Sequence, residues 1–246
     1  MSKHSDFIRT PIITILKEAI NIAEKVSNGI EMHPLYDYVI QTTFLKMTGF
    51  QEQKLKCIQW ELATDNYEYR HREISKNGIR GYSEYDDKND LYKDLFSHIV
   101  FNENEIEKIK NKIKTNLTEV SNIYEKSILF TGYQKQVKIY KDIWSKIKCE
   151  HFFCENKKSG RHLLSPNNFD EKNESLCYIY KEYLYKHRNR IAHNIVSYQQ
   201  NLPSLKSLID EKYKYNNYFL WFSILILIDN IFIELYNKYR ELSNEF

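Results

Sequence analysis

The sequence predicts an all-α protein, a helical bundle with additional N-terminal helices. Only six glycines and four prolines occur in 246 residues, which favours long helices with short connections over a β-sandwich or barrel. Apolar residues recur at three- and four-residue spacing through most of the chain, as in helices that bury one face. No strand pattern and no glycine-rich phosphate loop appears. A chain of this length can bury one substantial core, so we expect a single domain over residues 1–246.

The first half of the chain predicts a succession of helices. Thr10 and Pro11 are typical of a helix start, and apolar spacing continues from there to Asn28-Gly29. Further helices are expected over 34–49 and 50–69, either separate or continuous across Gly49. The charges of the latter segment predict mainly a solvated, ion-paired face, with some lining a functional cleft as the alternative; they are Glu52, Lys54, Lys56, Glu61, Asp65, Arg70 and Arg72.

Residues 75–90 are rich in Gly, Asn and Asp and predict a surface loop. Helices are expected over 91–101, from Asn104 onward and over 134–148, and a connecting loop over 156–173. A helix starting near 170–175 then carries the regular apolar line Leu176, Tyr180, Tyr183 with Leu184, His187 and Ile191. His187 lies on this line, which predicts a packed core histidine.

The last expected helix, 216–242, is the most apolar of the chain. Its stretch Phe219–Ile233 contains Asp229 and Asn230 and falls short of the ~20 apolar residues that span a membrane, so we expect a buried helix. Burial within a bundle explains part of this apolar width. Contact with the same helix of a second copy would explain the remainder, although a monomer with a thick helical coat would do so too.

Metal and disulfide chemistry are weakly indicated. Four cysteines, Cys57, Cys149, Cys154 and Cys177, are too few for a disulfide scaffold in a chain this long. Cys149, His151 and Cys154 invite a zinc hypothesis with Cys177 or His162 as fourth ligand, but their spacing matches no strong zinc pattern. We therefore predict no metal and no cofactor, with a zinc scaffold as an open alternative. The chain start lacks the apolar run of a signal peptide, which favours the cytoplasm.

The stretch 185–194, Tyr-Lys-His-Arg-Asn-Arg-Ile-Ala-His-Asn, carries the residues with the clearest chemistry. Arg188 is always charged and presents donors suited to phosphate oxygens. His193 is of the residue type whose unperturbed pKa is nearest neutrality, so it can give or take a proton. Together they suffice to cleave RNA without a metal. Helix-end residues of this kind could also simply bind the last carbonyls of a helix.

Helix geometry separates the two side chains. Positions five apart on an ideal helix are rotated by about 140°, so Arg188 and His193 do not share a face, whereas Asn189 and His193 do. Either the helix deforms or ends before His193, or the site gathers side chains from two subunits. Spacing favours neither, and we prefer the second.

The Arg-Asn-x-Ile-Ala-His arrangement resembles the signature of HEPN domains, an arginine separated from a histidine by four to six residues. These helical modules occur in many prokaryotic RNA-cutting toxins and antiphage proteins. The resemblance covers about residues 180–194 and implies a motif-bearing core at 131–246 with helical elaboration over 1–130. It also implies a metal-independent endoribonuclease that pairs two motifs in a homodimer. Family members often carry a tyrosine two places after the histidine; Ile195 stands there, which disfavours the toxin subgroup defined by that tyrosine.

The resemblance assigns roles to named residues. Arg188 would neutralise the scissile phosphate, His193 would act as general acid or base, and Asn189 would orient one of them. Further substrate contacts are expected from Asn194, Arg190 and Tyr198. The expected partners are RNA, with tRNA among the candidates, a second copy of the chain, and a regulatory or antitoxin protein, but no membrane. The alternative is a non-catalytic HEPN-like subunit that binds RNA or protein in a larger defence complex.

Overall fold

The computed structural model describes residues 3–25, 33–75, 80–99, 101, 103–156, 160–166, 175–193 and 214–243. Over these residues the fold is all-α, as the sequence predicts. The elements in chain order are α1 (Lys3–Arg9), α2 (Ile13–Ala23), α3 (His33–Asp65), α4 (Tyr67–Ile74), α5 (Tyr85–Ser97), α6 (Glu103–Lys126), the 3-10 helix η2 (Ile128–Tyr133), α7 (Gln134–Trp144), the 3-10 helix η3 (Cys149–His151), β1 (Cys154–Asn156), β2 (Gly160–His162), α8 (Leu176–Ile179), the π-helix η4 (Tyr180–Tyr185), α9 (Lys186–His193) and α10 (Tyr218–Ser243).

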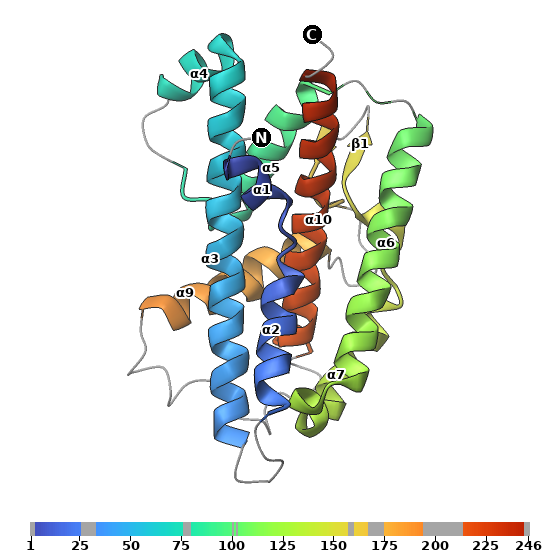
Figure 1. The fold of residues 1–246 in the computed structure, drawn as a ribbon. Coiled ribbons are helices and arrows are strands. Elements are labelled where there is room, and N and C mark those ends of the chain that lie inside the picture. The colour runs from blue at the N-terminus through green and yellow to red at the C-terminus, as the bar shows by residue number, and fades with distance from the viewer. Residues whose placement is uncertain are drawn as a thin grey trace.

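The bundle is organised around α10. Helices α3 and α6 flank it along its length, and α2 packs against α3 (Figure 1). The segment formed by α8, η4 and α9 runs across these long helices and contacts α3 (Figure 1). Buried apolar side chains from Ile8 to Tyr239 belong to one connected core. The expected motif-bearing part, 131–246, and the helical elaboration, 1–130, both contribute side chains to this core.

The prediction that the last apolar helix is buried is confirmed. Every residue from Phe219 to Ile233 is buried by the rest of the chain. The Asn217 side chain caps the helix by accepting hydrogen bonds from the backbone of Phe219 and Leu220 at 3.0 and 3.4 Å. By length and composition α10 could cross a membrane, but 83% of its most apolar window is buried in the bundle, as in the core helix of a globular protein. Its apolar width needs no second copy, so this stretch of α10 is unavailable as a dimer interface.

The two helices expected on either side of Gly49 are one. Helix α3 is continuous over 33 residues, and it runs through Gly49, where an added Cβ would touch nothing. The helix ends where Asn66 adopts an extended conformation and its side chain accepts a hydrogen bond from Tyr69 N at 2.8 Å, starting α4. The predicted helix does not continue to Tyr69, because Asn66 interrupts it and Tyr69 belongs to α4.

The expected helix start at Thr10 is also wrong. The Thr10 hydroxyl donates to Asp6 O at 2.9 Å, so it closes the unpredicted helix α1 instead of capping α2. Helix α1 is held by long-range contacts, since Ser5 Oγ bonds Tyr236 Oη at 2.7 Å and Arg9 Nε donates to Asn237 Oδ1 at 2.9 Å. Helix α2 ends at Ala23 with Glu24 as its C-cap, earlier than the expected end at 28–29, and residues 28–29 themselves lie outside the described residues.

Two further expectations about loops are corrected. The second half of the predicted loop 75–90 is helical, since α5 begins at Tyr85. Asp86 and Asp87 lie in its first turn, where a carboxylate interacts favourably with the positive end of the helix dipole. The predicted loop 156–173 contains part of a small antiparallel hairpin, in which β1 pairs with β2.

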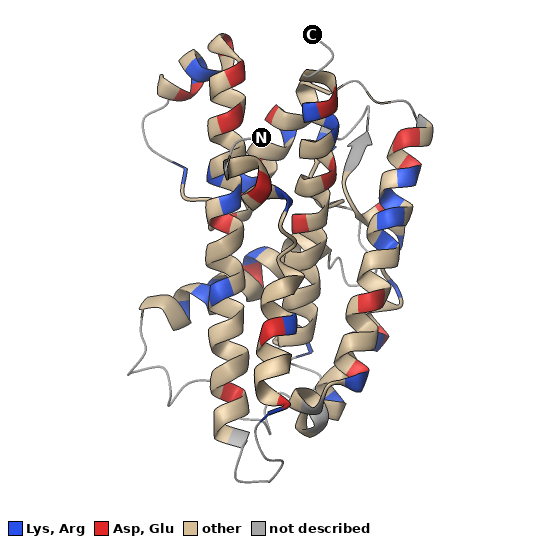
Figure 2. Cartoon of the chain, in the orientation of Figure 1, with Lys and Arg blue, Asp and Glu red and all other residues tan. Residues whose placement is uncertain are grey.

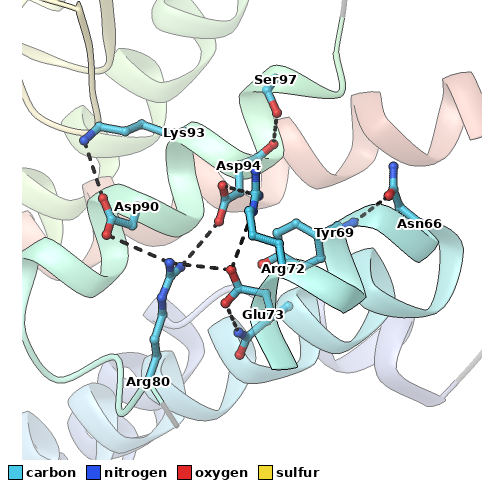
Figure 3. Close-up of polar contacts among 10 residues, drawn as sticks. Asn66, Tyr69, Arg72, Glu73, Arg80, Asp90, Lys93, Asp94 and Ser97 are labelled. Atoms are coloured by element: carbon cyan, nitrogen blue, oxygen red, sulfur yellow. Dashed lines mark hydrogen bonds and ion pairs between the residues drawn. The ribbon is translucent and has the colours of Figure 1, made fainter. Parts of the chain in front are cut away.

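Helices α4 and α5 are joined by a cluster of ion pairs (Figure 3). Arg72 Nη2 contacts Asp94 Oδ1 at 2.7 Å. The Arg80 guanidinium lies 3.4 Å from Asp94, 3.7 Å from Glu73 and 3.9 Å from Asp90. Tyr69 is the buried residue of α4, so these ion pairs supply much of the contact that holds α4 against α5. The cluster consists of paired cations and anions, which makes it a structural feature and a poor ligand site.

Candidate functional site

The motif lies on one helical segment that runs from Leu176 to His193. Ser175 starts it by accepting a hydrogen bond from Tyr178 N at 3.2 Å, which agrees with the predicted start near 170–175. Its middle six residues form the π-helix η4, a widened turn that occurs often beside functional sites. The predicted apolar line holds, since Leu176, Tyr180, Leu184 and His187 are buried; the wide turn itself was not predicted.

Helix η4 is attached to the residues just before α5 and to the first turn of α5. Tyr180 Oη donates to Ser83 O at 3.0 Å, and Tyr185 Oη donates to Glu84 Oε1 at 2.8 Å. Lys181 contacts Asp86 at 2.7 Å. These contacts fix the helix just before the motif residues begin.

Arg188 is held by a carboxylate from α3. Its Nη2 donates to both carboxylate oxygens of Glu52, at 2.9 and 3.2 Å, and its Nη1 donates to Asn189 Oδ1 at 3.0 Å. The side chains of Arg188 and Glu52 are only 20% and 13% exposed, so the guanidinium is oriented and partly desolvated. Within the described residues its Nε–H and one Nη1–H make no hydrogen bond, and these donors remain for a ligand.

His193 is the last residue of α9 and is exposed. The helix is regular from Lys186 through His193, so the expectation that it could deform or end before the histidine is wrong; the π-turn precedes Arg188. Arg188 and His193 therefore point in directions about 140° apart, and Asn189 shares the face of His193.

The other predicted contact residues are only partly described. Arg190 is half-buried and its Nε donates to Lys186 O at 3.3 Å. Asn194 and Tyr198 lie outside the described residues. Helix α9 carries Lys186, Arg188 and Arg190 and no acidic residue, which gives it a basic surface (Figure 2).

The prediction that His187 is a packed core residue is confirmed. It is buried, its Nε2 lies 2.6 Å from Tyr218 Oη, and its ring is 4.5 Å from that of Trp221. Burial lowers the pKa of His187 to about 3, with the charge of Arg190 adding to the effect. His187 is therefore neutral at physiological pH and is unsuited to a second acid–base role there.

One turn of α3 joins the site to the core. Gln51 Nε2 donates to Leu225 O at 2.9 Å, and Gln51 Oε1 accepts from Lys88 Nζ at 3.0 Å. Three residues on, Lys54 Nζ contacts Asp229 Oδ1 at 2.5 Å and Thr10 O at 2.7 Å. Glu52 lies between these two and reaches Arg188.

The expected solvated face of α3 is thus wrong in part. Lys54 is fully buried and Glu61 is buried. Glu52 contacts the motif arginine, as in the alternative that some of these charged residues line a functional site. A signal existed in the sequence: Gln51 and Lys54 continue the apolar line Phe44, Met47 and Ile58 of α3. Lys88 continues the line of Leu91, Tyr92 and Leu95 in the same way. Polar residues on an apolar line mark buried polar contacts.

The zinc alternative gains no support from the described part of the chain. There, no group of three His, Cys, Asp or Glu side chains is arranged to hold a metal ion. His151 Nδ1 accepts a hydrogen bond from Lys148 N at 2.8 Å, which occupies one of its two nitrogens. The side chain of Cys154 lies outside the described residues, so the full ligand set is not described.

Comparisons with protein-family models, with curated proteins and with solved structures find no match to this chain. The resemblance to HEPN domains therefore rests on the residues of the motif.

Proposed function

We propose that this chain is a metal-independent endoribonuclease of the HEPN type, acting in a toxin or antiphage defence system. The observation that carries the proposal is the way in which neighbouring side chains orient the guanidinium of Arg188. It is oriented by Glu52 and Asn189 and keeps donors that no described residue occupies, on a basic helix that ends in an exposed histidine. A carboxylate that fixes the plane of the guanidinium also fixes the direction in which its remaining donors meet a ligand.

The reaction that fits these groups is attack of the RNA 2′-hydroxyl on its own phosphate. The new bond joins the 2′-oxygen to phosphorus, and the bond to the 5′-oxygen breaks, which gives a 2′,3′-cyclic phosphate and a 5′-hydroxyl. Arg188 would stabilise the negative charge that grows on the phosphate oxygens. His193 would take the 2′-hydroxyl proton or supply the proton that the leaving 5′-oxygen needs.

A second copy of the chain would complete the site. Arg188 and His193 of one α9 point in different directions, so a single helix cannot direct both at one phosphate. Two antiparallel α9 helices could place the arginine of one chain beside the histidine of the other. The exposed end of α9 is accessible for this pairing, in contrast to the buried stretch of α10. A nuclease of this kind needs restraint in its own cell, so a regulatory or antitoxin partner is part of the proposal.

The test is cleavage of total RNA and tRNA by the purified protein in EDTA. We expect the unmodified protein to cut and leave 2′,3′-cyclic ends, and expect His193→Ala and Arg188→Ala to lose about 10²–10⁴-fold in rate. The matched controls His71→Ala and Arg70→Ala remove exposed residues of α4 and should cut normally. Equal cutting by all variants would point to another nuclease and would refute the assignment.

The alternative is a non-catalytic HEPN-like subunit that binds RNA or protein. One observation favours it: the charge of Arg188 is already partly balanced by Glu52, so the arginine could be structural. RNA binding that survives His193→Ala, together with no cutting by the unmodified protein, would support this second function.

A further inference from the structure

A series of hydrogen bonds leads from Arg188 to residues outside the motif. Arg188 Nη1 donates to Asn189 Oδ1 at 3.0 Å. The Asn189 side chain also bonds the hydroxyl of Tyr185, and Tyr185 Oη donates to Glu84 Oε1 at 2.8 Å. Together these contacts form a hydrogen-bond relay that begins at an exposed carboxylate and ends at the half-buried guanidinium.

The donors and acceptors of the relay fit together in one direction. The Glu84 carboxylate can only accept, so it takes the single proton of the Tyr185 hydroxyl. Burial raises the pKa of this phenol, so the proton is present at physiological pH. The amide nitrogen of Asn189 must then donate to the phenol oxygen, which leaves Oδ1 to accept from Arg188. The relay therefore sets which way the Asn189 amide faces, and bonds in such a series strengthen one another.

Arg188 is held at both of its terminal nitrogens. Nη2 contacts Glu52 of α3 at 2.9 Å. Nη1 is held through the relay by Glu84, which is the N-cap residue of α5. Contacts on two nitrogens restrict rotation about the Nε–Cζ bond more than a contact on one of them. The relay thus helps to keep the remaining donors of the guanidinium in one direction.

The wide turn of η4 explains how Tyr185 reaches Glu84. The hydrogen bonds of a π-helix join residues five apart, so Tyr180 and Tyr185, at the two ends of η4, lie on about the same side. An α-helix would rotate them apart by about 140°. Their hydroxyls donate to the consecutive residues Ser83 and Glu84, at 3.0 and 2.8 Å. The π-turn therefore lets both tyrosines attach to one short segment.

We propose that Tyr185 is a positioning residue of the phosphate site: by joining Glu84 to Asn189, its hydroxyl fixes the direction in which the motif arginine meets an RNA phosphate. This inference rests on the proposed function, and it adds two residues to the site. Tyr185 acts through Asn189 and does not need to touch the substrate. Opening the relay leaves the charge of the arginine in place and removes part of its orientation.

The first measurement needs no RNA. Rotation of the Arg188 guanidinium about its Nε–Cζ bond is followed by NMR with labelled arginine, and the signal is assigned by its absence in Arg188→Lys. Tyr185→Phe keeps the ring and removes the hydroxyl. Rotation should become about fivefold faster, the factor that corresponds to the loss of one ordinary hydrogen bond. Tyr178→Phe removes a hydroxyl from an exposed tyrosine of α8 and should leave the rotation unchanged.

The second measurement is the steady-state kinetics of RNA cleavage. Tyr185→Phe should lower kcat by about tenfold and change KM by less than about twofold, because a displaced catalytic group loses rate more than binding. Glu84→Gln keeps an acceptor for the Tyr185 hydroxyl and should lose about twofold. Glu84→Met removes the acceptor and should resemble Tyr185→Phe. The control Tyr178→Phe should match the unmodified protein.

Double variants distinguish positioning from general loss of stability. If the residues act through one relay, Tyr185→Phe with Glu84→Met should cut no more slowly than Tyr185→Phe alone. Likewise, Tyr185→Phe should have no further effect in an Asn189→Ala background. Losses that multiply in both pairs would show that the residues act separately, and the inference would fail.

The outcomes separate the inference from the proposed function. Cleavage by the unmodified protein with an unchanged kcat in Tyr185→Phe would overturn the inference alone. Faster rotation of the Arg188 guanidinium in Tyr185→Phe, without cleavage by the unmodified protein, would overturn the nuclease and keep the positioning of the arginine. Unchanged rotation and no cleavage would overturn both. If Tyr185→Phe fails to fold, Glu84→Met opens the same relay from its exposed end.

Discussion

Glu52 and Arg188 lie 136 positions apart in the chain, and Arg188 Nη2 reaches both oxygens of the Glu52 carboxylate at 2.9 and 3.2 Å. The pair joins the long helix α3 to the motif helix α9. It fixes the plane of the guanidinium, because a fork of donors against a carboxylate is a directional contact. The motif therefore depends on a residue that no local pattern around it contains.

Glu52→Gln should reduce RNA cleavage by roughly 10- to 100-fold, since a small misplacement of a catalytic group has an effect of this size. The decrease is expected mainly in kcat, because the amide keeps the shape of the site but holds Arg188 less firmly. Steady-state cleavage kinetics provide the measurement. Glu68→Gln, on the exposed part of α4, is the matched control. A rise in activity would instead identify Glu52 as an inhibitor of Arg188.

The buried pair Lys54–Asp229 should show a strong difference between single and double substitution. Both side chains are 1% exposed, and burial raises the pKa of Asp229 while Lys54 opposes the increase. Lys54→Met or Asp229→Asn alone should lower the free energy of unfolding by about 3–5 kcal/mol, and the double variant by much less. Urea unfolding measures each value. Additive losses would show that the two charges do not interact.

His187 should make the protein sensitive to acid. Its pKa is about 3 in the folded protein and close to 6.5 when unfolded, so between these values the unfolded chain binds the extra proton. The free energy of unfolding then decreases as the pH falls from about 6.5 toward 3, by up to about 1.4 kcal/mol per pH unit. Its full contribution is present only above pH 6.5.

The measurement for His187 is thermal or urea unfolding across this pH range for the unmodified protein and for His187→Gln. The variant should lose this component of the slope, while His71→Gln, which changes an exposed histidine, should retain it. Parallel slopes for all three proteins would contradict the assignment of a neutral buried imidazole.

Arg80 should determine how firmly α4 is attached. Arg80→Met removes one of the two arginines that contact Glu73 and Asp94 and leaves Arg72. Because the two carboxylates are only 10% and 15% exposed, the expected cost is about 1–3 kcal/mol. Hydrogen exchange should become faster in α4 while α10 keeps its protection. Arg70→Met, which removes an exposed arginine next to Tyr67, serves as the control. Unchanged exchange in α4 would show that Arg80 does not determine how firmly this helix is attached.

Local patterns were sufficient for much of the fold. The spacing of apolar residues predicts α10 and the buried line of the motif helix, because these depend on side chains three and four positions apart. The same patterns placed Lys88 in a loop, because its run of Asp and Asn residues resembles a turn. The start at Thr10 failed for a similar reason, since contacts to Tyr236 and Asn237 create α1.

The site was predicted less completely than the fold. Arg188, Asn189 and His193 are neighbours in sequence and could be recognised together. Glu52 could not, because its contact with Arg188 exists only after α3 and α9 have packed. A polar residue on an apolar line, as at Lys54 and Lys88, shows that a buried contact exists and does not show with which partner.

The central place of α10 has a consequence for synthesis on the ribosome. Helix α10 is made after every other described helix, yet α3, α5 and α6 all pack against it. Until it emerges, these helices lack their common packing surface, and His187 lacks Tyr218 and Trp221. Contacts that join distant parts of a chain form late in folding. The contacts that order the motif segment therefore form only once α10 has been synthesised, which places the activity proposed for this segment late in folding.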